Sequence, residues 1–417
     1  MNSLKIAYIL PVYWPAIGGC EIHTHELVKR LSDKHKIKVI TQINNQDDKL
    51  KRELWFAAIL QAPGKVTKYL DHKAEVYRIP LHLLQKAFLF PLARVQSTRI
   101  PGPVRDPLAI LLSKFFEKKL MEFVADCDLI HCVHGGVSYL GYAALKVAKK
   151  KQIPFVYTPV PHFYYQEGYA EMRFAPRGWM NRFWFNICRE ADALITMTDF
   201  EKKFFVKKGV LAEKIYHVGV GPVLSNNGNG LEFRRKYHVD GKYIVLFLGR
   251  NVEYKGIEEI LLAARKVWQR YPDVYFFFVG PQEGRAKQIF ANYIDRRIIT
   301  TGSVSLSEKT SALMACDILC MPSLQESLGG VFIEAWMYEK PIIGGNIPPI
   351  RELTGNGKGG FLVNPNPEEI ARRIINLLED RNLRQAMGKW GKEKVLANCT
   401  WEKIAGKLEN IYTQLVA

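Results

Sequence analysis

The chain has 417 residues, a formal net charge of +18, and 48% hydrophobic against 24% charged residues. These values are typical of a globular protein with enough material for two buried cores. The sequence offers no run of about 20 uninterrupted apolar residues that would predict a membrane-spanning helix. The seven cysteines are scattered without a CxxC pair, so we expect reduced thiols in a cytoplasmic protein and no zinc ribbon.

Apolar runs alternate with helical patterns along the first half of the chain, which predicts a parallel sheet with helices between its strands. Thr198 and Glu201 form a capping-box pattern that predicts the start of one further helix. We expect strands at residues 4–10, 37–41, 128–133, 154–158 and 192–197, and helices near 20–34, 138–151 and 178–191.

Residues 222–242 are rich in Asn, Gly and charge, which predicts a linker. A second series of strands follows, and the end of the chain is helical near 367–395 and 401–415. We therefore predict an α/β protein with doubly wound domains at 1–221 and 222–398, and ligands at the carboxyl ends of the strands. The strands of the second series are expected at 243–249, 274–280, 297–302, 317–323, 341–345 and 360–363.

The segment LHLLQKAFLFPLARVQSTR, residues 81–99, departs from this scheme because it mixes Leu and Phe with scattered cations. Residues 1–220 carry 33 Lys and Arg against 20 Asp and Glu, so +13 of the net charge lies in the first half. The segment either lies on an anionic membrane surface or packs on its domain as an excursion. The second interpretation is slightly favoured, and we expect no nucleic-acid partner.

The stretch ESLGGVFIEAW, residues 326–336, is the most informative in the chain. Gly329 and Gly330 stand where a helix should begin, and a helix N-terminus without side chains suits a phosphate. Glu326 precedes this turn, and Glu334 lies roughly 6 Å further along the helix axis than Gly330. The pattern favours a diphosphate at the helix end between two carboxylates, and the alternative is an amphipathic helix with two surface glutamates.

The loop GRNVEYKG, residues 249–256, places Arg250 and Lys255 at the carboxyl end of a predicted strand. Arginine can hold phosphate oxygens in a bidentate fork, and lysine adds a point charge. The pair could therefore neutralise a diphosphate without a metal. Either cation alone would more often be a surface residue.

Four further residues of the first half are candidates for a ligand site. Gly18 and Gly19 form a flexible turn before a helix, which a plain strand–helix connection explains about as well as a ligand loop. His134 follows a predicted strand, as does His162, and each could donate to a sugar hydroxyl or a phosphate.

Two patterns that resemble metal motifs are set aside. Asp126 and Asp128 form a D-x-D pattern at the wrong end of a strand, and His23 and His25 are two apart on a helix. We therefore expect no metal site and no tightly bound cofactor.

These motifs together resemble the retaining, nucleotide-sugar-dependent glycosyltransferases of family 4, which have the GT-B fold. The specific matches are GRNVEYKG, DILCMPSLQESLGGVFIEAWMYEKPIIGG and IRELTGNGKGGFLVNP, and the looser ones are PVYWPAIGGCEIHTHELVKRL, DLIH and ADALITMTDFEKKFF. The resemblance implies two Rossmann-like domains facing a cleft and a last helix, 399–417, that crosses back to the N-terminal domain.

The resemblance also implies roles for the residues that match its E-x7-E motif. Glu326 would contact the donor sugar and Glu334 the ribose, while backbone amides from Leu328 to Gly330 would bind the distal phosphate. The cationic pair of the family falls on Arg250 and Lys255, and its glycine loop on Gly18 and Gly19. His134 comes one residue later than the corresponding family histidine, and Gly330 replaces a bulkier apolar residue.

We therefore predict a hexosyl- or related glycosyltransferase that uses a nucleoside diphosphate sugar, with a UDP-sugar favoured over a GDP-sugar. The acceptor would be a hydroxyl group of a lipid or lipid-linked glycan at the cytosolic face of a membrane, and no metal would be needed. A GT-B-fold sugar-nucleotide epimerase and a non-catalytic basic membrane or nucleic-acid adaptor are the alternatives. The sequence does not identify the nucleobase, the sugar or the linkage.

Overall fold

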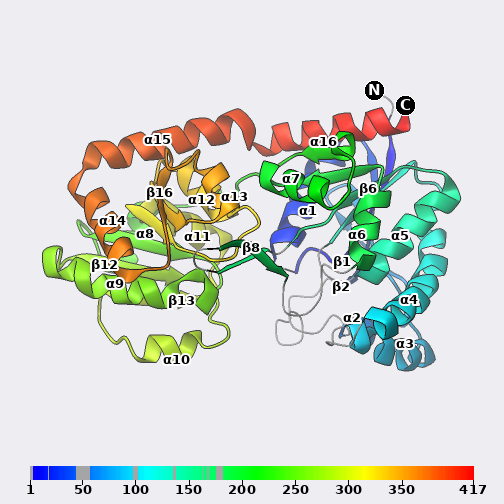
Figure 1. Cartoon of the computed structure of the whole chain (residues 1–417), viewed down its shortest axis with the longest axis horizontal. Helices are drawn as coiled ribbons and strands as arrows, with labels where there is room; N and C mark the ends of the chain where they lie inside the picture. Colours follow the sequence, from blue (N-terminus) through cyan, green and yellow to red (C-terminus); the bar gives the residue numbers. More distant parts are fainter. Residues whose placement is uncertain are drawn as a thin grey trace. The chain divides into compact units, whose positions relative to one another are not determined.

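The computed structural model describes residues 3–16, 18–43, 57–96, 102–134, 138–161, 163–166, 169–174 and 182–417. The chain forms two compact units, and each contains one large sheet that is wholly or mostly parallel (Figure 1). The first unit contains Met1–His162, Arg173–Gly219 and Trp401–Ala417. The second unit contains Phe163–Met172 and Val220–Thr400.

The sheet of the first unit has the strand order β10-β9-β6-β5-β1-β2-β4-β3. All its neighbouring strands are parallel except β3 and β4, which form an antiparallel hairpin at one edge. Residues 6–10 of β1 are completely buried, as expected for a central parallel strand with both faces covered. The strands are β1 (Lys5–Val12), β2 (Lys36–Ile43), β3 (Thr67–Asp71), β4 (Ala74–Arg78), β5 (Leu129–Val133), β6 (Phe155–Thr158), β9 (Ala193–Thr196) and β10 (Ile215–His217).

The helices of the first unit follow the predicted alternation, with additions between β2 and β5. Thr198 caps α7, because its side chain accepts a hydrogen bond from the backbone N–H of Glu201 at 3.1 Å, which confirms the capping-box prediction. The helices are α1 (Gly19–Leu31), α2 (Ala57–Gln61), α3 (Leu83–Gln96), α4 (Gly102–Phe123), α5 (Ser138–Lys151), α6 (Arg182–Glu190), α7 (Asp199–Lys207), the 3-10 turn η2 (Ala212–Lys214) and α16 (Trp401–Val416).

The second unit contains a six-stranded parallel sheet with the order β13-β12-β11-β14-β15-β16. Its strands are β11 (Tyr243–Leu248), β12 (Val274–Val279), β13 (Ile298–Gly302), β14 (Ile318–Met321), β15 (Ile342–Gly345) and β16 (Gly360–Val363). Its helices are α8 (Gly230–Lys236), η3 (Glu253–Lys255), α9 (Ile257–Arg270), α10 (Ala286–Ala291), α11 (Leu306–Ala315), α12 (Gly330–Met337), α13 (Pro348–Leu353), α14 (Pro367–Glu379) and α15 (Arg381–Asn398). A separate two-stranded sheet consists of β7 (Phe163–Gln166) and β8 (Tyr169–Phe174).

Two expectations about local structure were wrong. The helix expected at 367–395 is two helices, α14 and α15, because the Asp380 side chain accepts from the N–H of Leu383 at 2.8 Å and starts a new helix. The linker expected at 222–242 contains α8, whose first turn is capped by the side chain of Asn229. In both cases a capping side chain, that of Asp380 or Asn229, starts a helix at a point where the sequence pattern did not indicate one.

The described part of this segment, residues 81–96, contains α3 (Leu83–Gln96), which packs on its unit in part. Leu89 and Ala93 of α3 are buried, whereas Leu83, Leu84 and Phe88 are exposed. Arg99 lies outside the described residues. Both readings of this segment from the sequence are therefore compatible with the fold, since one side of the helix is covered and the other is open.

The last helix returns to the first unit, as predicted, and packs against α1 (Figure 1). The Tyr412 hydroxyl lies 2.6 Å from the hydroxyl of Tyr8 and 2.5 Å from Nδ1 of His131. His131 also lies 2.8 Å from the Thr158 hydroxyl through Nε2. Because all four groups are buried, this chain of hydrogen bonds anchors α16 across β1, β5 and β6. Among the described residues, no helix has the length and apolar character needed to cross a membrane.

Candidate active site

Lys255 and Glu326 meet because β11 and β14 are neighbouring parallel strands. Lys255 lies in the short turn η3 after β11, and Glu326 lies in the loop after β14, so both project from the carboxyl edge of the sheet. The Lys255 Nζ is 2.6 Å from Oε1 of Glu326, with side-chain exposures of 13% and 12%. A further hydrogen bond, from the N–H of Leu324 to the carbonyl of Tyr254 at 2.8 Å, joins the two loops.

Glu334 is a buried carboxylate on α12 rather than a surface residue. Its side chain is 8% exposed, and Oε1 accepts from Lys309 Nζ at 2.7 Å and from the N–H of Val223 at 3.3 Å. Its Oε2 is buried and has no hydrogen-bond partner among the described residues. An unpaired buried oxygen is costly, so this atom is suited to accept a hydrogen bond from a bound hydroxyl.

The two glycines at the start of α12 have different roles. Gly329 adopts a φ of +81°, and a Cβ there would lie 2.6 Å from the ring of Phe332. Gly330 is the first helical residue, and a Cβ there would meet nothing within 4 Å. Leu328 is nearly buried just before them. Gly329 therefore shapes the turn, while Gly330 leaves open space at the positive end of the helix dipole.

Arg250 follows β11 and is held by one residue of its own loop and one residue of the loop after β12. Its Nη1 donates to Oε2 of Glu283 at 3.0 Å, and its Nη2 donates to the hydroxyl of Tyr254 at 2.8 Å. The guanidinium remains 44% exposed. These contacts orient a cation at the same sheet edge as Lys255 while leaving part of it open to solvent.

The candidates from the first half of the chain lie in the other unit. Gly18 is the N-cap of α1, and a Cβ there would lie 2.2 Å from Oε2 of Glu21, whereas a Cβ on Gly19 would meet nothing within 4 Å. His134 is buried directly after β5, and its carbonyl accepts from the Tyr157 hydroxyl at 2.9 Å. His162 lies outside the described residues.

The residues set aside as metal ligands have other partners. Asp126 binds Lys38 Nζ at 2.5 Å, and Asp128 accepts from the backbone N–H of Lys5 at 2.7 Å. His23 packs against the ring of Trp401, while His25 contacts a carboxylate on a different element.

The sequence did not point to Lys309, Tyr254 or Glu283 as parts of the site. Lys309 lies on α11 and reaches Glu334 across 25 residues of sequence, and Glu283 reaches Arg250 across 33. Neither pair belongs to a local motif, so periodicity and spacing gave no signal for them.

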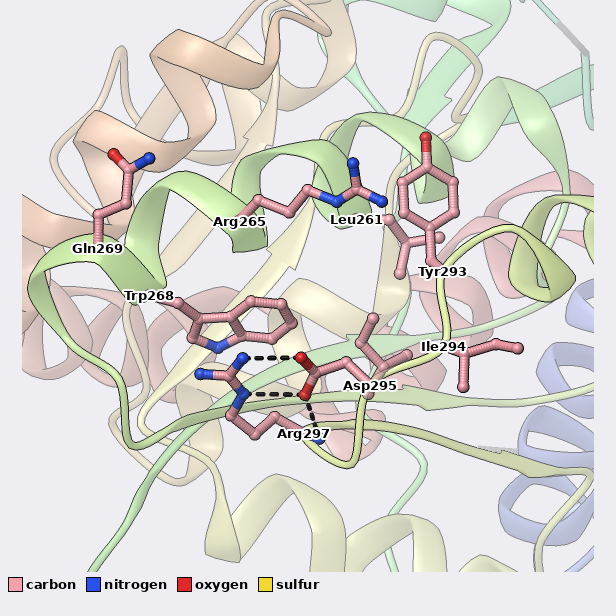
Figure 2. A pocket seen from close by; sticks show the side chains of 9 residues that line it. Leu261, Arg265, Trp268, Gln269, Tyr293, Ile294, Asp295 and Arg297 are labelled. Carbon is pink, nitrogen blue, oxygen red and sulfur yellow. Dashed lines mark hydrogen bonds and ion pairs between the residues drawn. The ribbon is translucent and has the colours of Figure 1, made fainter.

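A shallow pocket of about 420 Å³ lies elsewhere on the second unit, between α9 and the segment before β13 (Figure 2). Its charged groups bind one another: Arg297 donates to both carboxylate oxygens of Asp295 and stacks 3.8 Å over the ring of Trp268. Because Asp295 precedes the amino end of β13, this pocket is at the opposite sheet edge from Lys255. The pocket is therefore not part of the same site as Lys255 and Glu326.

Two family models match the chain in succession. The model described as Glycosyltransferase Family 4 matches residues 17–221, and the model described as Glycosyl transferases group 1 matches residues 231–394. All the candidate residues of the carboxyl edge of the second sheet fall within the second match.

Relatives with assigned names have low to moderate identity. An uncharacterized glycosyltransferase of Methanocaldococcus jannaschii is 22% identical over the full length of both chains. The phosphatidyl-myo-inositol mannosyltransferase of Mycobacterium tuberculosis is 30% identical over 175 residues, which cover 40% of this chain and 46% of that protein.

Solved structures match along the whole chain. Sucrose-phosphate synthase from Thermosynechococcus elongatus aligns with a TM-score of 0.71 and 20% identity, covering 99% of both chains. The HepE protein of Anabaena in complex with UDP-glucose aligns with a TM-score of 0.69 and 17% identity, covering 99% of this chain and 100% of that one. At these identities the likeness establishes the GT-B fold.

Proposed function

Because the chain belongs to glycosyltransferase family 4, we propose that it is a retaining enzyme that moves a hexosyl or related sugar from a nucleoside diphosphate to a hydroxyl acceptor. The observation that carries the proposal is the pairing of Lys255 with Glu326 at the shared carboxyl edge of β11 and β14. Glu326 lies in the segment that leads into the glycine start of α12, and Lys255 reaches it from the turn after β11. A cation and a helix N-terminus can bind a diphosphate, and a carboxylate can bind the hydroxyl groups of the sugar joined to it.

The diphosphate would lie against Arg250, Lys255 and the amides from Leu328 to Gly330. In the reaction, the bond between the anomeric carbon and the diphosphate oxygen breaks, and a bond to the acceptor oxygen forms on the same face of the sugar. The proton of the acceptor hydroxyl is transferred to an oxygen of the departing diphosphate, so the reaction does not depend on a basic side chain of the enzyme. The two cations stabilise the charge that develops on the diphosphate.

The two carboxylates would bind different parts of the donor. Glu334 would offer Oε2, a buried oxygen that has no hydrogen-bond partner in the described part of the chain, to the ribose hydroxyls. Glu326 would bind hydroxyls of the sugar once Lys255 turns toward the phosphates. We favour a UDP-sugar as the donor, which is consistent with the UDP-glucose bound by the structurally similar Anabaena protein.

A lipid or lipid-linked glycan at a membrane surface is the acceptor we propose. The side chains of Leu83, Leu84 and Phe88 on α3 are 81%, 84% and 59% exposed, which leaves an apolar surface on a helix of the basic half of the chain. Apolar side chains beside cations fit an anionic lipid surface. The name of the mycobacterial relative, which specifies a phosphatidylinositol acceptor, supports this class. By the family resemblance, His134 would be a catalytic residue and the Gly18–Gly19 turn would bind the nucleotide sugar.

Thermal-shift measurements with UDP, GDP and ADP, followed by their sugar conjugates, test the donor assignment. We expect UDP to raise the melting temperature more than GDP or ADP, and a UDP-sugar to raise it further. Turnover of that UDP-sugar to UDP and an epimerised free sugar, without an acceptor, would indicate the epimerase alternative. Absence of a shift with every nucleotide would favour the adaptor.

A further inference from the structure

His25, Asp71 and His72 converge in the first unit, although none of them belongs to the proposed donor site. His25 lies on α1, Asp71 ends β3, and His72 follows it in the turn of the β3–β4 hairpin. One nitrogen from each histidine and a carboxylate oxygen of Asp71 all lie within 4.8 Å of one another. We propose that these three side chains bind a divalent transition-metal ion of the zinc class.

The distances are close to those that such an ion requires. Nδ1 of His25 is 2.7 Å from Oδ2 of Asp71, and Nε2 of His72 is 3.9 Å from Oδ1. Ligand atoms bound at about 2.0–2.2 Å in a tetrahedral zinc site are roughly 3.3 Å apart. The two separations, each to a different carboxylate oxygen of Asp71, lie on either side of this value, so small movements of the side chains would admit the ion. Three protein ligands would leave one position for water.

The surroundings hold two of the ligands in place. The hydroxyl of Tyr13 donates to Oδ2 of Asp71 at 2.6 Å, and the ring of Trp14 stacks on His25 with centroids 4.5 Å apart. The Tyr69 hydroxyl donates to the carbonyl of Trp14, which joins β3 to the same loop. Outer hydrogen bonds of this kind orient metal ligands and raise affinity.

The burial of the three side chains fits an accessible but partly dry site. Asp71 is 8% and His25 is 12% exposed, whereas His72 is 41% exposed. An ion could therefore enter from the side of His72, and two imidazoles with one carboxylate are ligands that suit zinc and its first-row neighbours. The ion would join the hairpin to α1. The other reading of the same contacts is a simple hydrogen bond from His25 to Asp71 that makes this connection without metal.

Cobalt titration of the full-length protein, stripped with a chelator, separates these readings because Co²⁺ bound by protein nitrogen and oxygen ligands shows visible d–d bands. We expect one Co²⁺ per chain, displaced by one Zn²⁺. His72→Ala should weaken binding at least about tenfold, and its exposure makes it the variant least able to disturb the fold. His238→Ala is the matched control, since His238 also has a positive φ, of 55° against 54° for His72, but lies in the second unit.

The result that overturns the proposal is a wild-type protein without d–d bands, or equal Co²⁺ binding by the wild type and the His72→Ala variant. Zinc should also raise the melting temperature of the wild type and not that of the His72→Ala variant. Melting of both proteins without metal should coincide, which separates loss of a ligand from loss of folding. Because the titration uses no nucleotide sugar, its outcome is independent of the donor assignment.

Discussion

Lys255 and Glu326 are 71 residues apart in sequence, yet their side chains form an ion pair of 2.6 Å with almost no exposure to solvent. The pair exists because the fold places β11 beside β14, so that the loops following both strands share an edge. A largely buried cation that already has a carboxylate partner is available to a phosphate only when a ligand enters and the pair rearranges. Binding of the donor and reorganisation of the pair are therefore coupled.

Replacement of Lys255 by alanine should lower the rate of sugar transfer by about 10²–10³-fold, the usual cost of losing one preorganised charge at a developing anion. Arg250→Ala should have the same direction of effect. Steady-state transfer from a UDP-sugar measures both, and Lys287→Ala, an exposed lysine on α10, serves as the control. Full activity of both site variants with every donor would falsify the phosphate assignment.

The same change at Lys255 leaves the Glu326 carboxylate buried without its partner, which can cost about 3–5 kcal/mol of stability. The double variant Lys255→Met with Glu326→Gln removes both charges. We expect it to recover the melting temperature lost in Lys255→Ala while remaining inactive. A double variant that regains transfer as well would show that stability, and not chemistry, was lost.

Replacement of Glu334 by glutamine should weaken donor binding more than it slows the reaction. One of its oxygens binds Lys309 and the other has no partner among the residues that the structure describes, so the variant loses a charged acceptor for the ribose. A hydrogen bond to a charged group contributes about 1.5–3 kcal/mol, which corresponds to roughly a 10–100-fold increase in KM. Glu339→Gln, an exposed neighbour bound to Lys392, is the control, and an unchanged KM in Glu334→Gln would argue against ribose binding.

Replacing the two adjacent glycines at the start of α12, Gly329 and Gly330, should have opposite effects on stability. Gly329→Ala should destabilise the protein by about 1–2 kcal/mol from the left-handed backbone alone, and more from the contact with Phe332 at 2.6 Å. Gly330→Ala should keep or slightly raise the melting temperature, because its Cβ meets open space. It should nevertheless raise KM for the donor, since that space is where the phosphate would lie. Equal effects of the two changes on melting would contradict this division.

Acid should weaken the anchoring of the last helix. Burial, and after it the nearby His23, lowers the pKa of His131 from 6.5 to about 3, so the neutral ring is the folded form. The unfolded chain then binds more protons below pH 6.5, and the stability from His131 is lost as the pH falls from 6.5 toward 3. By pH 5 the loss is about 2 kcal/mol.

Chemical denaturation of the wild type and of His131→Asn at pH 7.5 and 5 measures this difference, with exposed His82→Asn as the control. The free energy of unfolding should fall less with acid in His131→Asn than in the wild type, by about 2 kcal/mol. An identical acid dependence in all three proteins would mean that His131 does not remain neutral in the folded state.

The sequence alone pointed to those residues of the proposed donor site that lie within short motifs. Glu326, Glu334, Gly329 and Gly330 fall within one stretch, and Lys255 lies in a loop that a strand and a helix pattern flank. Their shared sheet edge followed from the doubly wound architecture. The contribution of Lys309 was not predictable, because it depends on the packing of α11 beside α12.

The contacts of the first unit were harder to predict from the sequence, because they too depend on packing between distant elements. The β3–β4 hairpin brings Oδ2 of Asp71 within 2.7 Å of Nδ1 of His25, although the two residues are 46 apart in sequence. No local sequence pattern around either residue predicts this contact. The described residues between β2 and β5 form the helices α2, α3 and α4, which the alternation of strand and helix did not predict. Tertiary packing, rather than periodicity, decides which side chains meet there.

Exposed apolar side chains on α3 should bind an anionic membrane. Flotation with vesicles should recover the wild type with anionic lipids and much less with neutral lipids, and high salt should reduce recovery by screening the cations. Replacing Leu83, Leu84 and Phe88 together by serine should lower the partition coefficient at least tenfold, since burial of each such side chain contributes about 1.5–3 kcal/mol. The matched control replaces Leu231 and Ile294, which are 66% and 93% exposed on the second unit. Equal recovery with neutral and anionic vesicles, or an equal loss of binding in the control variant, would contradict the proposal that α3 binds the membrane.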